Sequence, residues 1–244
     1  MRRPPVSYSL TVFTPINLAI IAFELVVLVL VISVHDCAQA WAANRLGDPT
    51  ARMLGRLTLN PAKHFDTWGT LVWPLLFIFR SPLVLGWGKP VPMTYRNFRA
   101  RNGEMLAILA GPAAQLLTAV VALVLLIVFK HTMVGAAQSI GLVDILAFRP
   151  QIDVLPDLPG IFPVLLFLYL VILVSLLLFC FNLVPMPFLD GGRILLYFLP
   201  YNAQRAFEQY SFYFMIAFFF IGFRLIMIGF APLMAIFNGL LNHF

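Results

Sequence analysis

The chain has 244 residues, of which 61% are hydrophobic and only 11% are charged. Soluble domains carry about 25% charged residues, so this composition excludes an ordinary globular protein and predicts an integral membrane protein. In such a protein the net charge of +6 reflects basic cytoplasmic loops, and we expect no nucleic-acid partner. The two cysteines lie in apolar runs, which excludes a secreted disulfide framework.

The first predicted span covers about residues 17–44. It follows a basic N-terminus with Arg2 and Arg3, and the combination resembles a signal peptide. The apolar run 16–34 is longer than a typical signal-peptide core, so we expect a retained span and not a cleaved leader.

A polar, basic stretch follows at 45–66, and the alternating pattern of 52–60 predicts a short strand. Residues 67–79 are apolar but too few to cross a bilayer, and they contain Pro74, which favours a re-entrant or interfacial segment. The proline-rich segment 83–94 is incompatible with a helix interior and predicts a second short strand.

The next long span is predicted at 104–129, and a polar loop follows at 130–159. Another span is expected at 162–184. Pro and Gly then interrupt the chain, and the apolar tail 203–241 is long enough for one long or two short helices.

Together these elements predict an all-α polytopic membrane protein of about five to six membrane segments. Short strands and a re-entrant segment separate its first two long spans. We expect one domain over residues 1–244, with a core at about 15–200 and C-terminal helices over 203–241. Residues 45–103 contain nine basic and two acidic residues, which places them in the cytoplasm and the N-terminus outside, although Arg2 and Arg3 oppose this orientation.

Several polar side chains lie inside these apolar segments, where a charged group costs about 3 kcal/mol or more and usually has a function or a partner. His35 and Gln39 are four residues apart and share one helix face. Polar groups from two distant segments fall at one depth, so we expect the segments to pack together; these groups are Glu24, His35, Asp36, Gln39, Asn182 and Asp190.

The chain resembles the site-2 protease family of intramembrane zinc metalloproteases, particularly its compact bacterial branch. The resemblance covers about residues 20–200 and rests on His35 followed, in the expected order, by four blocks: "AWAANRLGDPTARMLGRLTLNPAKHFDTWGTLVWP", "LGWGKPVP", "LAGPAAQ" and "FNLVPMPFLDGGR".

The resemblance implies zinc held by two histidines four residues apart and by an aspartate, with a glutamate as general base on the metal-bound water. Here His35 and Asp190 match two ligands, and Asn182 matches an asparagine near the catalytic centre. Gln39 replaces the second histidine, and Asp36 replaces the glutamate base. The neutral amide of Gln39 is a poor zinc ligand, so the replacement of the second histidine leaves zinc binding in doubt.

Other positions allow more than one interpretation. Gln115 stands where the family usually has Asn, and Gly111 and Pro112 before it either face substrate or form a helix-packing kink. Asp190 can also cap the helix that follows it. Phe188 stands where Pro is usual.

Three further polar residues, Cys37, His64 and Glu24, lie near the predicted site in the sequence or in its matching blocks. Cys37 lies about 200° around the helix from His35 and is expected to face away from a metal. His64 is expected to be structural and not a ligand. Glu24 either lines a water path or pairs with a neighbouring span.

The sequence therefore predicts a site-2 protease homologue with a degenerate zinc site, a metalloendopeptidase by family whose hydrolysis is impaired. It would act on or bind transmembrane helices in a bacterial inner membrane, in contact with lipid. The alternative is a non-catalytic pseudoprotease that binds or sequesters membrane substrates. A transporter is a remote alternative, because the chain has no paired repeats. Oligomeric state is left open.

Overall fold

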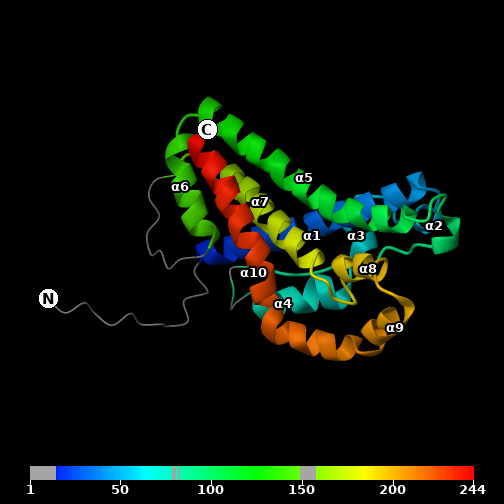
Figure 1. Ribbon diagram of the computed structural model, residues 1–244. Helices are drawn as coiled ribbons and strands as arrows, with labels where there is room; N and C mark the ends of the chain where they lie inside the picture. The colour runs from blue at the N-terminus through cyan, green and yellow to red at the C-terminus, as the bar shows by residue number, and fades with distance from the viewer. Residues whose placement is uncertain (1–14, 79–80, 82, 149–157) are drawn as a thin grey trace, which may run out of the picture.

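The computed structural model describes residues 15–78, 81, 83–148 and 158–244, and all regular structure within these ranges is helical (Figure 1). The long helices are α1 (Pro15–Arg45), α5 (Gly103–Thr132), α7 (Phe162–Asn182) and α10 (Ser211–His243). Shorter elements connect them, namely α2 (Thr50–Met53), α3 (Pro61–His64), the π-helix η2 (Thr67–Val72), α4 (Trp73–Phe77), the 3-10 helix η3 (Tyr95–Asn97), α6 (Ala136–Ala147), α8 (Asp190–Leu196) and α9 (Tyr201–Gln209).

Four helices in the described part of the chain are long and apolar enough to cross a membrane: Ile16–Arg45, Gly103–Thr132, Phe162–Asn182 and Phe220–His243. The predicted all-α polytopic membrane class is confirmed, with α4 and α6 as shorter apolar helices beside these four. The chain is a multi-pass integral membrane protein.

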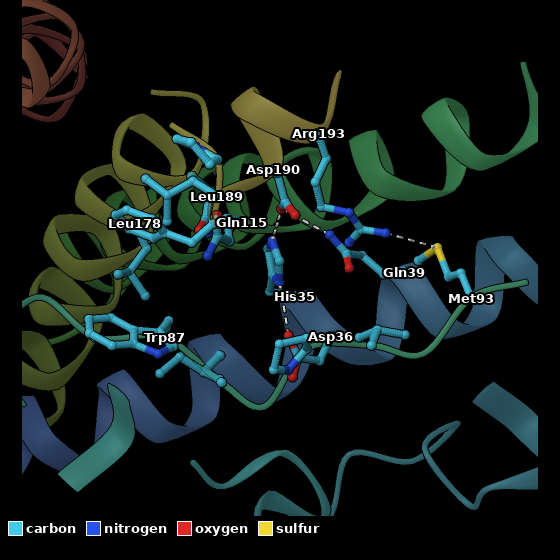
Figure 2. A pocket seen from close by; sticks show the side chains of 18 residues that line it. His35, Asp36, Gln39, Trp87, Met93, Gln115, Leu178, Leu189, Asp190 and Arg193 are labelled. Atoms are coloured by element: carbon cyan, nitrogen blue, oxygen red, sulfur yellow. Dashed lines mark hydrogen bonds and ion pairs between the residues drawn. The ribbon is translucent and has the colours of Figure 1, made fainter. Parts of the chain in front are cut away.

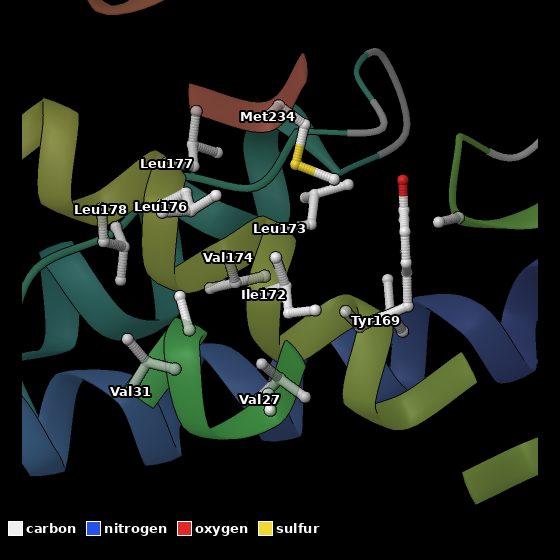
Figure 3. Close-up of a cluster of buried hydrophobic side chains, with 14 of the residues drawn as sticks. Val27, Val31, Tyr169, Ile172, Leu173, Val174, Leu176, Leu177, Leu178 and Met234 are labelled. Carbon is white, nitrogen blue, oxygen red and sulfur yellow. The ribbon is translucent and has the colours of Figure 1, made fainter. Parts of the chain in front are cut away.

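Helix α7 forms the centre of the bundle and packs against α1, α5, α6 and α10. It is apolar on every side, as expected for a helix surrounded by other helices. Figure 3 shows this core, where Val27 and Val31 of α1 lie close to the fully buried Ile172 and Val174 of α7. Because α7 packs against both α1 and α5, which also contact each other, the three helices form the framework for the polar residues described below.

The two predicted strands are not present. Residues 52–60 begin inside α2 and continue through a turn at Gly55, whose φ of +68° is left-handed. The alternating pattern there lacks a partner strand, and the amide of Arg56 instead bonds to the carbonyl of Ala51. Residues 83–94 form neither a helix nor a ladder with any described segment.

The other predicted segments have the following outcome. The short apolar stretch at 67–79 is helical over η2 and α4, whose Thr67–Phe77 length is too short for a crossing. The predicted loop 130–159 contains the helix α6, and its residues 149–157 lie outside the described part. The tail forms a short amphipathic helix, α9, and the long helix α10.

Candidate functional site

A tight turn places Asp190 at the start of α8, inside the bundle. A Cβ on Gly192 would lie 1.8 Å from the carbonyl oxygen of Met186, and one on Gly191 would lie 2.3 Å from that of Leu183. Only glycine allows so close an approach of two backbone segments. The Gly-Gly pair therefore lets α8 fold back onto the end of α7 and directs the Asp190 side chain at α1.

Asp190 meets two α1 side chains that are one helical turn apart. Its Oδ2 lies 2.8 Å from Nε2 of His35 and accepts a hydrogen bond of 2.9 Å from Nε2 of Gln39 (Figure 2). The same Gln39 nitrogen donates to the carbonyl oxygen of Ile108 in α5, at 3.1 Å. All three polar side chains are buried. One oxygen atom of Asp190 thus joins α1 to α8, and Gln39 joins both to α5.

Gly111 and Pro112, predicted to face substrate or to form a kink, lie buried in α5. A Cβ on Gly111 would lie 2.4 Å from Nε2 of His35 and 2.8 Å from Nε2 of Gln39. The absence of a side chain at Gly111 is therefore what lets α5 lie directly against these two residues. This contact supports the packing interpretation of the pair.

Asp36 faces a second group of polar residues. Its Oδ1 lies 3.1 Å from Nδ1 of His35. Its Oδ2 accepts a hydrogen bond from Arg56 at 3.3 Å and lies 3.2 Å from Nδ1 of His64. Arg56 and His64 are also buried, and Nε2 of His64 donates to the carbonyl oxygen of Thr58 at 2.7 Å. The carboxylate of Asp36 is thus held by side chains from the segment that follows α1.

The extended segment 86–90 runs beside these groups. The amides of Trp87 and Lys89 donate to the carbonyl oxygens of Gly69 and His64, at 3.2 and 2.8 Å. Their carbonyl oxygens accept hydrogen bonds from Thr70 and Arg56, at 2.9 and 2.5 Å. One edge of the segment is therefore saturated.

The opposite edge belongs to Gly86 and Gly88, since successive residues of an extended chain direct their backbone groups to opposite sides. Neither residue makes a backbone hydrogen bond to another described residue. Both line a polar cavity of about 420 Å³, which is also lined by His35, Asp36, Gln39, Gln115, Asn182, Asp190 and Arg193.

Asn182 and Gln115 meet in this cavity, where Nδ2 of Asn182 donates to Oε1 of Gln115 at 3.2 Å. The structure thus brings the predicted Asn182 and Gln115 close to His35, Gln39 and Asp190. Cys37 and Glu24 are absent from the residues that line the cavity.

The family model of Peptidase family M50 matches residues 23–222. The chain belongs to peptidase family M50. This confirms the site-2 protease resemblance seen in the sequence. A protein of Bacillus subtilis (strain 168) described as "Putative zinc metalloprotease YwhC" is 31% identical over 202 residues, which are 82% of this chain and 80% of that protein. No solved structure matches the chain.

M50 membership implies zinc, and the family resemblance assigns its ligands to positions 35, 39 and 190. Zinc needs three protein atoms with free electron pairs, usually from His, Cys or carboxylate. Gln39 instead directs its amide nitrogen at two acceptors, Asp190 Oδ2 and Ile108 O, and rotating the amide would bring its oxygen against both. His35 has a carboxylate oxygen beside each ring nitrogen. No group of three His, Cys, Asp or Glu suited to a metal occurs in the described ranges. The residues as arranged do not fit a catalytic zinc.

Two contributors to this site were not predicted from the sequence. Nothing in the sequence pairs Arg56 or His64 with Asp36, and the sequence predicts only a structural role for His64. Their role depends on the turn at Gly55, which returns the chain toward α1. The one available signal was a basic residue between apolar positions in "MLGRLTL".

Proposed function

We propose that this M50 protein is a non-hydrolytic receptor that binds unwound segments of transmembrane proteins. The observation that supports this proposal most strongly is the orientation of Gln39. Its amide donates a hydrogen bond to Asp190, which stands at the position of a metal ligand in the family. His35 and Gln39 both contact Asp190 at the same carboxylate oxygen, Oδ2.

The position of Asp36 supports the same function. A general base must reach a water molecule with an available carboxylate oxygen. Both oxygens of Asp36 already have partners, His35 at one and Arg56 with His64 at the other. Neither carboxylate oxygen of Asp36 is therefore free to take a proton from a water molecule.

The free edge of Gly86 and Gly88 supplies the binding surface. A strand with one saturated edge and one open edge can pair with an extended peptide, whose main chain then provides the affinity. A peptide that has left its helical form in the membrane must find such partners, because unpaired backbone groups are costly there. The amides of Gln115 and Asn182 in the same cavity offer further donors and acceptors. We place this receptor in a bacterial inner membrane, with residues 45–103 in the cytoplasm.

Zinc content tests the non-hydrolytic part of the proposal. Protein purified in detergent without a histidine tag should contain no more zinc per chain, by elemental mass spectrometry, than its His35→Ala variant. About one zinc per chain that is lost in His35→Ala would overturn the proposal in favour of a working metallopeptidase with Gln39 tolerated. The double variant Asp36→Glu with Gln39→His provides the positive comparison, because it carries the complete family motif.

Photo-crosslinking tests the binding part. A photoreactive residue replaces Phe188, which lines the cavity and is exposed, or Leu117 of α5, which is an exposed control. A synthetic transmembrane peptide with a central Gly-Pro break should crosslink at the first position and not at the second. A continuous Leu-rich helix should crosslink at neither. Equal yields at both positions, or from both peptides, would contradict recognition of unwound segments.

A further inference from the structure

Asp36 lies directly beneath the segment that carries the open edge. A Cβ on Gly88 would lie 2.7 Å from Oδ2 of Asp36, so the backbone of Gly88 rests on this carboxylate. The side chain of Asp36 is buried, and its charge is balanced by Arg56 at 3.3 Å. The carboxylate of Asp36 therefore packs directly against the backbone of the segment 86–90, at Gly88.

Arg56 connects the carboxylate of Asp36 to the segment 86–90. Its guanidinium donates to the carbonyl oxygen of Lys89 at 2.5 Å and approaches that of Pro90 at 3.4 Å, while contacting Asp36. A guanidinium has five donors in a fixed planar fork, so it can serve three acceptors at once in one orientation. That orientation is set by the buried carboxylate of Asp36.

His64 makes the same connection at the saturated edge of the segment. Its backbone carbonyl accepts the amide of Lys89 at 2.8 Å, and its ring nitrogen Nδ1 lies 3.2 Å from Asp36 Oδ2. Lys89 is thus held at its amide by one partner of Asp36 and at its carbonyl by the other. This arrangement fixes which backbone groups point away from the cavity and which point into it.

We propose that Asp36 acts as a positioning residue: through Arg56 and His64 it holds residues 87–90 so that the backbone of Gly86 and Gly88 faces the cavity. The residue that stands at the family's general-base position thereby orders the peptide-binding edge. The inference rests on the proposed function for the binding role of that edge, whereas the ordering itself can be measured without any peptide.

Hydrogen exchange of the amides in 83–94, measured by mass spectrometry on the full chain in detergent, tests the ordering. Arg56→Met removes the donors to Lys89 and Pro90, and Asp36→Asn removes the charge that orients them. Both variants should speed exchange at Trp87 and Lys89 by about tenfold or more, because hydrogen bonds to charged groups contribute strongly. Arg52→Met is the matched control, since Arg52 is an exposed arginine in the same segment, and it should leave exchange unchanged.

Two further measurements separate positioning from general loss of structure. Exchange in α7 should stay slow in every variant, and Arg56→Lys should recover part of the protection, because lysine keeps the charge and three donors. If Arg56→Met also exposes α7, the nearly isosteric Asp36→Asn decides the question. Unchanged exchange at Trp87 and Lys89 in Asp36→Asn would overturn the inference.

The crosslinking peptide distinguishes this inference from the proposed function. If exchange responds as expected but no peptide crosslinks at Phe188, the ordering is real and the receptor role fails. If the wild type crosslinks the peptide and Asp36→Asn does so equally well, the receptor role stands and positioning by Asp36 fails.

Discussion

Replacing Gln39 by alanine removes both hydrogen bonds that its amide makes across three helices. The bond to the Ile108 carbonyl is neutral and contributes about 1 kcal/mol, and the bond to the Asp190 carboxylate contributes about 1.5–3 kcal/mol. Gln39 is 2% exposed, so solvent does not replace these partners. We expect Gln39→Ala to lower the free energy of unfolding by about 2.5–4 kcal/mol, measured by denaturant titration in mixed micelles.

Gln138→Ala is the control, because Gln138 is an exposed glutamine on the apolar helix α6 and should change stability by less than about 0.5 kcal/mol. On the proposed function a strong zinc chelator should leave the wild-type unfolding curve in place, since hydrogen bonds from His35 and Gln39 join α1 to α8 without a metal. The reasoning is refuted if Gln39→Ala unfolds like Gln138→Ala, or if the chelator alone reproduces the loss.

Two other predictions concern a close contact and a pH dependence. Gly111→Ala should destabilise by about 1–3 kcal/mol in the same titration, because its Cβ would lie 2.4 Å from His35 Nε2, whereas Gly141→Ala, with open space around it, should be neutral or stabilising. Burial would raise the pKa of Asp48, but hydrogen bonds from Thr50, Asn97 and the Thr94 amide outweigh it and hold the pKa below the ordinary 3.8. Asp48 therefore stabilises the fold above that value, and unfolding curves of wild type and Asp48→Asn should converge as the pH falls from about 5 toward 3. A constant difference over this range would contradict that assignment.

The long helices were predictable because their sequences are apolar over lengths that fit a bilayer. The span predicted at 104–129 is α5, and the one at 162–184 is α7, with ends a few residues away. Helix α6 was missed because Asp144 interrupts its apolar pattern. The partner of that aspartate, the hydroxyl of Tyr169 at 2.5 Å, lies 25 residues away in α7. Local sequence could not show that this polar group would be satisfied.

At the site, the sequence indicated which residues would meet but not what they would do together. The family blocks point to His35, Gln39 and Asp190, and the first two each lie within hydrogen-bond distance of Asp190. The direction of the Gln39 amide depends on the Ile108 carbonyl, a backbone group that is present at every residue and carries no signature. The contact of Arg56 with Asp36 likewise depends on a turn, so composition and spacing could not reveal it.

Gln39 and Asp36 stand at two ends of one hydrogen-bond network that runs through His35, and this arrangement limits what a single substitution can change. A mutation that returns histidine to position 39 leaves Asp36 engaged by Arg56, and one that returns glutamate to position 36 leaves Asp190 engaged by Gln39. On the proposed function, neither change alone restores hydrolysis, and the first also removes the hydrogen bonds that Gln39 donates to Ile108 and Asp190. On the proposed function, a chain carrying this pair of substitutions has no single-step route back to peptide-bond cleavage.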